Sequence, residues 1–290
     1  MKIGFFGTPE LSAAVLRDCL AADDVEVAYA VSQPDRPVGR HADMTASPVS
    51  RLAMESGLPL YRPEKIRNNP EFLAELQKFE VDYLVVVAYG RILPVEILAL
   101  PKRLPVNVHG SLLPKYRGAS PIQSALLEGE KETGVTIMEM TAGMDEGGIL
   151  EMTAIAIDPE ETSDTLFAKF AKISGNSLLS ALRKHADHRI SIVEQDHSLA
   201  TYTKKFEKDN GRILWAEMTA TEVYRRWQAC TTWPGAWTVL DGKRIKICGC
   251  TVVASDPSAL TPGSFRTTAG GRIHVVTKEG TIELGDVIVE

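Results

Sequence analysis

The sequence predicts an α/β fold with a doubly wound, mostly parallel sheet, followed by a smaller C-terminal β-barrel domain. Two observations lead to this fold class. The first two thirds of the chain alternate strand and helix patterns, and residues 83–88, Tyr-Leu-Val-Val-Val-Ala, are apolar on both faces, as expected of a central parallel strand. Short β-type runs separated by turn residues fill the last third, which is typical of a small barrel.

The elements of the first part follow from hydrophobic periodicity and from helix-end signals. Ser47-Pro48 begins a helix that Gly57 can end, because serine is favoured at the cap, proline in the first turn and glycine just after the last turn. Ser120-Pro121-Ile122-Gln123 has the spacing of a capping box, which predicts a helix running toward Gly129. Hydrophobic periodicity adds strands at 2–6 and 25–31 and a helix at 9–20.

A polar stretch separates the α/β part from the rest of the chain. We expect an α/β domain at residues 1–188, a linker with little core of its own at 189–206, and the β-barrel domain at 207–290. Asp241-Gly242 and Glu279-Gly280 have the composition of hairpin turns. The elements expected beside them are a helix at 222–228 and strands at 237–240, 244–247, 272–276 and 281–284.

Composition is that of a globular protein long enough to bury a full core, with 290 residues of which 44% are hydrophobic. No apolar run reaches the roughly 18 residues of a membrane span, so we expect a cytoplasmic protein without a membrane segment. We also expect a monomer. The net charge of -6 argues against a protein that coats nucleic acid, although residues from Lys204 onward carry twelve Lys or Arg against ten Asp or Glu.

Several kinds of cofactor are disfavoured by missing motifs. Gly7-Thr8-Pro9-Glu10 follows the first strand, where a dinucleotide-binding protein would carry a glycine-rich fingerprint, and no phosphate loop ending in Gly-Lys-Ser/Thr is present. Cys248-Gly249-Cys250 lacks the second cysteine or histidine pair of a zinc site. We therefore expect neither nicotinamide nor ATP chemistry, and no metal.

Asn107-Val108-His109 is the most informative part of the sequence. Side chains alternate along a strand, so Asn107 and His109 emerge on one side, and an amide donor lies beside an imidazole. Asp145, in the glycine-flanked run Gly143 to Gly148, can supply a carboxylate that orients the imidazole. Such a group suits attack on a carbonyl carbon. Taken singly, the three residues also fit a strand-end cap, an interior histidine and an Asx-turn.

The run at residues 107–150 resembles the folate-dependent formyltransferases. Further motifs match that family in the same order: Gly7-Thr8-Pro9-Glu10, Gln33 to Arg40, Ala88 to Pro94 and Trp233-Pro234-Gly235-Ala236. Two stretches depart from it. Met144-Asp145-Glu146-Gly147 stands where the family usually has Leu-Asp-Thr-Gly, and His41-Ala42-Asp43 stands where it usually has Gly-Lys-Lys.

The resemblance implies an enzyme that takes the formyl group of 10-formyltetrahydrofolate and transfers it to an amino group. In the branch with these motifs the acceptor is methionyl initiator tRNA, for the initiation of protein synthesis. Asn107, His109 and Asp145 would be catalytic, with His109 acting either as a base or as a charged group that stabilises the oxyanion. The folate pocket would be lined by Ser111, Leu112, Leu113, Pro114, Arg91, Ile92 and Leu93.

The resemblance also implies an OB-like C-terminal domain that contacts tRNA. The loop at residues 34–48 is long for a connection within a domain and carries Arg36 and Arg40, which we expect to contact tRNA. Lys115 and Arg117 flank the active site and are further candidates for this contact. A role in tying the loops down is the alternative for these cations.

Two other kinds of function stay open at this point. Formyltransferases acting on a small amine or a nucleotide sugar, and formyl-folate hydrolases, use the same Asn-His-Asp group. A folate- or tRNA-binding protein without catalytic activity is also conceivable, because Glu146 adds a carboxylate beside Asp145.

Overall fold

The computed structural model describes residues 1–38, 43–254 and 261–289. Within the described chain, contacts group the residues into two compact units. Unit 1 comprises residues 1–117, 134–155 and 167–202, and unit 2 comprises residues 118–133, 156–166 and 203–290. Unit 2 thus draws two segments from the first two thirds of the chain. The predicted boundaries at 188 and 206 stay a prediction.

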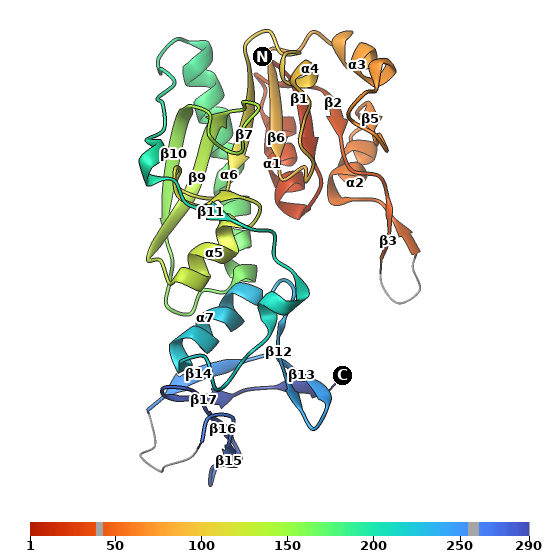
Figure 1. Cartoon of the computed structure of the whole chain (residues 1–290). Helices are drawn as coiled ribbons and strands as arrows, with labels where there is room; N and C mark the ends of the chain where they lie inside the picture. Colours follow the sequence, from red (N-terminus) through yellow and green to blue (C-terminus); the bar gives the residue numbers. More distant parts are fainter. Residues whose placement is uncertain (39–42, 255–260, 290) are drawn as a thin grey trace. The chain divides into compact units, whose positions relative to one another are not determined.

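The described residues of the α/β part form a seven-stranded sheet with the order β10-β9-β7-β6-β1-β2-β5 (Figure 1). The pairs from β7 to β5 are parallel, and β9 runs antiparallel to β7. This confirms the predicted doubly wound, mostly parallel sheet. Its strands are β1 Lys2–Gly7, β2 Glu26–Val31, β5 Leu60–Tyr61, β6 Tyr83–Val87, β7 Leu104–His109, β9 Glu132–Glu139 and β10 Ile149–Ala156.

The centre of the sheet is the best-buried part of the molecule. All five side chains of β6 are buried, as its continuous apolar run predicted. Fully burying an aliphatic or aromatic side chain of this size contributes about 1.5 to 3 kcal/mol. Phe6, Tyr29, Phe72 and Tyr89 pack in the same apolar cluster as the β6 residues Leu84 and Val86. The sheet therefore gives the ends of β6 and β7 a rigid support.

The predicted helices form, but one of the expected caps does not. The helix α2 begins as predicted, with the Ser47 hydroxyl accepting a hydrogen bond from the Ser50 amide at 3.0 Å. At α5 the capping-box prediction is wrong, because the Ser120 side chain makes no cap and instead accepts a hydrogen bond from the Phe206 amide. The helices are α1 Glu10–Ala21, α2 Pro48–Glu55, α3 Pro70–Gln77, α4 Val95–Leu98, α5 Pro121–Glu128, α6 Ser163–Ala186 and α7 Ala220–Cys230.

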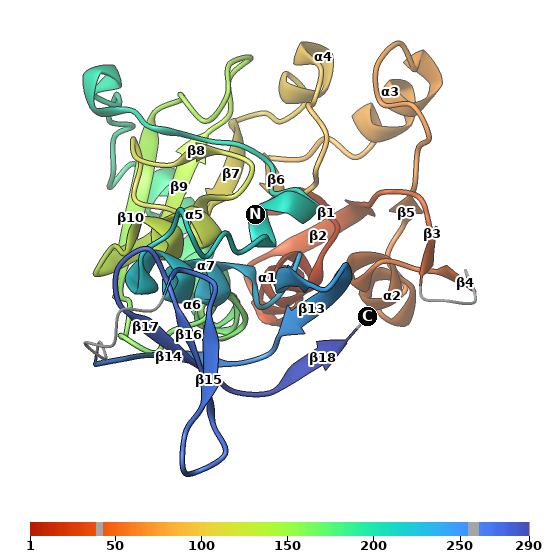
Figure 2. The same cartoon turned by 60° about the horizontal axis from the view of Figure 1, so that its bottom comes forward.

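The C-terminal part is a small β-rich domain, as predicted (Figure 2). Its described strands lie in two antiparallel sheets, with orders β12-β13-β18 and β14-β17-β16-β15. Asp241 and Gly242 have φ angles of +49° and +77° and form the predicted turn between β12 and β13. The strands are β12 Ala236–Leu240, β13 Lys243–Ile247, β14 Cys250–Val253, β15 Phe265–Thr267, β16 Ile273–Val276, β17 Thr281–Leu284 and β18 Val287–Val289.

Two short ribbons complete the architecture. The strands β3 Arg36–Val38 and β4 Asp43–Thr45 pair with each other and extend from the sheet between β2 and α2 (Figure 1). The strands β8 Arg117–Gly118 and β11 Tyr202–Thr203 pair as well. Of the residues described, none belongs to a helix long and apolar enough to cross a membrane.

Candidate active site

The carboxyl end of β7 presents Asn107 and His109 on one face of the sheet. Val106 and Val108 alternate with them and are buried on the opposite face. In the pairing with β9, His109 lies opposite Thr136. His109 is 5% exposed, whereas Asn107 is partly exposed. The strand thus holds a buried imidazole next to an amide that a ligand can reach, at the end of the sheet where open α/β folds bind their ligands.

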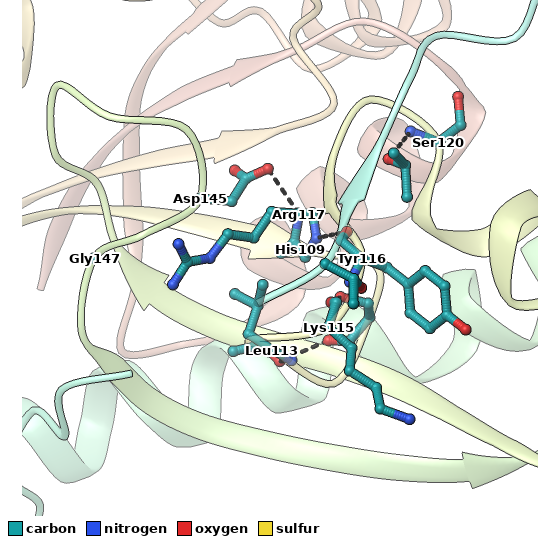
Figure 3. Close-up of polar contacts among 12 residues, drawn as sticks. His109, Leu113, Lys115, Tyr116, Arg117, Ser120, Asp145 and Gly147 are labelled. Carbon is teal, nitrogen blue, oxygen red and sulfur yellow. Dashed lines mark hydrogen bonds and ion pairs between the residues drawn. The ribbon is translucent and has the colours of Figure 1, made fainter. Parts of the chain in front are cut away.

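The two ring nitrogens of His109 face different groups (Figure 3). Nε2 donates a hydrogen bond to the Tyr116 carbonyl at 3.0 Å, and Nδ1 lies 3.7 Å from Oδ2 of Asp145. A carbonyl oxygen can only accept, so Nε2 carries a hydrogen. Nδ1 is therefore the ring nitrogen that faces the Asp145 carboxylate.

Asp145 lies in the connection between β9 and β10. Its φ of +51° is in the left-handed region, which non-glycine residues adopt only when their surroundings compensate. Gln195 supplies part of this support, because its side-chain amide donates to the carbonyls of Asp145 and Gly147. The neighbouring Glu146 is exposed, and its carboxylate lies over Gly143.

The loop after β7 is tied down by hydroxyl groups. The Ser111 hydroxyl donates to the Lys115 carbonyl at 2.6 Å. Thr136 on β9 is fully buried, and its hydroxyl donates to the Ser111 carbonyl and accepts from the Leu113 amide. Sequence reasoning missed Thr136, because only the pairing of β9 with β7 brings it to this loop.

The residues expected to line a folate pocket follow two neighbouring parallel strands. Arg91, Ile92 and Leu93 come after β6, and residues 111–114 come after β7, so both segments lie at the carboxyl edge of the sheet. The Arg91 guanidinium donates to the carbonyls of Pro63 and Glu64. Leu93 is buried in the apolar core, whereas Ile92 is 64% exposed. Ile92 is thus the member of this segment whose side chain is open to a ligand.

The cations expected to contact tRNA differ in their surroundings. Arg36, on β3, and Lys115 are exposed. Arg40 lies outside the described residues. Arg117 is 1% exposed, and its guanidinium donates to Gln195, Tyr202 and His197. The expectation that Arg117 contacts tRNA is therefore corrected, because its hydrogen-bonding groups are engaged inside the protein.

Residues 1–38, 43–254 and 261–289 contain no group of three or more His, Cys, Asp or Glu side chains that could hold a metal. Burial raises the pKa of the Cys19, Cys230 and Cys250 thiols to about 12. These cysteines stay protonated at neutral pH and are poor nucleophiles.

Comparison with known proteins assigns the family. The model of the formyl transferase family matches residues 1–182, and that of the formyl transferase C-terminal domain matches residues 205–290. The chain belongs to the formyl transferase family. Sequence relatives of this formyl transferase include the methionyl-tRNA formyltransferase of Caldicellulosiruptor saccharolyticus, 37% identical over 100% of this chain and 93% of the relative. That of Myxococcus xanthus is 40% identical over 99% of this chain and 89% of the relative.

Solved structures share the fold of this formyl transferase. Methionyl-tRNA formyltransferase from Clostridium thermocellum has a TM-score of 0.64 at 14% identity, covering 100% of this chain and 99% of that one. The N-formyltransferase from Helicobacter canadensis, solved with folinic acid and dTDP-3-aminofucose, has a TM-score of 0.71 at 17% identity, covering 99% and 100%. At these identities the likeness concerns the fold alone.

Proposed function

We propose that this formyl transferase transfers the formyl group of 10-formyltetrahydrofolate to the α-amino group of methionyl initiator tRNA. The observation that carries the proposal is the identity of 37% and 40%, over nearly the whole chain, to proteins named methionyl-tRNA formyltransferase. The contact of His109 with Asp145 at the carboxyl edge of the sheet supports the chemistry. The exposed Arg36 on the β3–β4 ribbon supports a macromolecular acceptor.

The reaction exchanges one amide for another without consuming water. A bond forms between the α-amino nitrogen and the formyl carbon, the bond from that carbon to the folate nitrogen breaks, and one proton passes from the amine to the folate nitrogen. Negative charge develops on the formyl oxygen as the amine attacks, so a donor aimed at that oxygen lowers the barrier. The side-chain amide of Asn107, partly exposed at the end of β7, is suited to this role.

His109 is suited to handle the proton. Its Nε2 hydrogen is engaged by the Tyr116 carbonyl, which leaves Nδ1 to accept the amine proton and return it to the leaving nitrogen. The Asp145 carboxylate, 3.7 Å from Nδ1, stabilises the imidazolium formed in between. Placed beside the formyl oxygen, the charged ring also stabilises the oxyanion, so that one cycle uses both of the roles considered for His109.

The substrates also need binding residues. We propose that residues 111–114 and Arg91 to Leu93 line the folate pocket, with Ile92 packing on the ligand. Arg36 and Lys115 would contact the acceptor end of the tRNA, and Arg40 is proposed for the same role on its sequence alone. We further propose that the protein acts as a monomer in the cytoplasm.

Formyl transfer to charged initiator tRNA tests the proposal directly. The purified chain is incubated with 10-formyltetrahydrofolate and methionyl initiator tRNA, and formyl-methionine is measured after the ester is hydrolysed. Free methionine and a nucleotide-linked amino sugar are the parallel acceptors. Transfer to the tRNA with little or none to the small amines supports the proposal. Equal or faster transfer to a small amine contradicts it, and release of formate without transfer identifies a hydrolase.

A further inference from the structure

Gln195 connects the predicted linker to the loop that carries Asp145. It is 5% exposed, and its side-chain Nε2 donates to the Asp145 carbonyl at 2.9 Å and to the Gly147 carbonyl at 2.7 Å. Its Oε1 accepts from Nε of Arg117 at 3.1 Å and from Nη2 at 2.7 Å. Figure 3 shows the Arg117 side chain extending toward the loop of Asp145 and Gly147.

The orientation of the Gln195 amide is determined by its partners. A guanidinium can only donate and a backbone carbonyl can only accept, so the oxygen must face Arg117 and the nitrogen must face the loop. A primary amide of this length satisfies all four of these hydrogen bonds at once. A glutamate would keep the contact with Arg117 but would turn an oxygen toward the two carbonyls.

The same connection reaches the other side of His109. Arg117 directly follows Tyr116, whose carbonyl accepts the hydrogen bond from His109 Nε2. The Arg117 amide donates to the Thr201 carbonyl at 2.8 Å, and the Tyr116 amide donates to the Thr201 hydroxyl at 2.8 Å. The partners of both ring nitrogens, Tyr116 and Asp145, are therefore joined through Arg117 and Gln195.

The Asp145 loop requires such support. Residues 141–144 are exposed, and Asp145 itself has a positive φ. We infer that Gln195, held by Arg117, is a positioning residue for the formyl-transfer reaction, which sets the distance between the Asp145 carboxylate and His109 Nδ1. Gln195 does not touch the reacting atoms, and its effect on turnover passes through Asp145.

The inference rests on the proposed function for its kinetic test, and the chain offers a matched control. Gln228 is likewise a buried glutamine, 6% exposed, whose Nε2 donates to two backbone carbonyls, those of Pro159 and Glu161. Gln195→Glu and Gln228→Glu therefore make the same chemical change at two places. We expect Gln195→Glu to lower kcat roughly 10- to 100-fold, because a misplacement of about 1 Å at a catalytic group costs on that order. Gln228→Glu should keep kcat within about two-fold of the wild-type value, because it misplaces no catalytic group.

A double-mutant cycle separates positioning from general damage. If Gln195 acts through Asp145, Gln195→Glu should change kcat by less than about three-fold in an Asp145→Ala background, since coupled residues are not additive. Additive effects, or equal kcat values for Gln195→Glu and Gln228→Glu, would overturn the inference. Gln195→Met, which removes both sets of hydrogen bonds without placing a charge, replaces the glutamate variant if the latter does not fold.

Amide hydrogen exchange tests the same inference without any substrate. Gln195→Glu should raise the exchange rates of residues 143–148 while leaving those of β6 unchanged, and Gln228→Glu should leave residues 143–148 as in the wild type. Unchanged exchange in this loop would count against the inference whatever the kinetics give. If the wild type does not formylate methionyl-tRNA, the proposed function fails, whereas the exchange data still decide the role of Gln195.

Discussion

His109 owes its chemistry to two unlike neighbours. A carbonyl, that of Tyr116, engages Nε2, and a carboxylate, that of Asp145, faces Nδ1. The carbonyl determines the tautomer of the neutral ring, because it can only accept a hydrogen bond. At the scale of single residues, these two contacts are the basis of the proton transfer proposed for His109.

Removal of the side chains proposed to be catalytic gives the first prediction. Asn107→Ala, His109→Ala and Asp145→Ala should each lower kcat by roughly 10²- to 10⁴-fold, the range for lost oxyanion donors and acid-base groups. The Kd for folate, measured by calorimetry, should change little, because the segments proposed to line the folate pocket, 91–93 and 111–114, are left intact. A His109→Ala enzyme with near-normal turnover would remove this mechanism.

Glu146 gives a second prediction at this scale. Glu146 is exposed, and its carboxylate lies over Gly143. Water screens the interaction of a solvent-accessible charge with its neighbours, so Glu146→Thr should leave the pH dependence of kcat/KM unchanged. Initial rates measured from about pH 5 to about pH 9, on either side of the ordinary histidine pKa, provide the check. A displaced profile would mean that this departure from the family pattern influences Asp145 or His109.

Among the elements, the β3–β4 ribbon carries Arg36, which we propose to contact tRNA. Arg36 pairs in register with Thr45, and the residues from Asp43 to Thr45 are exposed. The Asp35 carboxylate at the base of the ribbon forms an ion pair with Arg62 at 2.6 Å. We propose that the exposed Arg36, on a ribbon anchored at its base, contacts a phosphate of the tRNA without any rearrangement of the sheet.

Arg36 is the ribbon residue to test. Arg36→Ala should raise the KM for methionyl-tRNA and reduce the slope of log KM against log salt by about one, since each lost phosphate contact releases about one counterion fewer. Arg189→Ala is the control, because Arg189 is an exposed arginine paired with Asp187. If Arg36 only stabilises the ribbon, Tm will fall while the salt slope matches that of the Arg189 variant.

At the scale of the whole molecule, His185 near the end of α6 should make the stability of the fold sensitive to acid. Burial, Arg103 and His188 lower the pKa of His185 from its ordinary value of 6.5, and its Nδ1 shares a hydrogen bond of 2.9 Å with the Tyr83 hydroxyl. The folded state therefore takes up this proton less readily than the unfolded state. Below pH 6.5 the unfolded chain is protonated first, so the contribution of neutral His185 to stability is present above that pH and declines as the pH falls.

The lowered pKa of His185 leads to a prediction for thermal unfolding. The wild-type Tm should fall between about pH 7 and about pH 5, before the carboxylates with lowered pKa values, among them Asp24 and Asp196, lose their contributions nearer pH ~4. His185→Gln should show a smaller fall, because glutamine can still hydrogen-bond to the Tyr83 hydroxyl but takes up no proton. Parallel Tm curves for the two proteins would exclude His185 as the source.

Much of the fold and part of the site follow from local sequence patterns alone. The apolar run of β6, the alternation along β7 and the turn at Asp241-Gly242 are properties of neighbouring residues, which short-range sterics and burial determine. Asn107 and His109 therefore share a face in any strand that contains them. The capping box predicted at Ser120 is wrong, because the Ser120 hydroxyl accepts a hydrogen bond from the amide of Phe206, a residue distant in the sequence.

Only the tertiary structure decides which distant residues meet at the site. Asp145 lies beside His109 although 36 positions separate the two in the sequence. Thr136 contacts the loop after β7 because β9 pairs with β7. Gln195 comes from a segment with the composition of a linker and binds the loop of Asp145. Arg117 is likewise not predictable from local sequence. This cation, expected at the surface, is buried and hydrogen-bonded to Gln195 and Tyr202. The sequence by itself determines strands, turns and the face each side chain shares, because these depend on local geometry. Burial and partners of polar side chains depend on the surfaces that long-range packing brings together, and no local pattern encodes them.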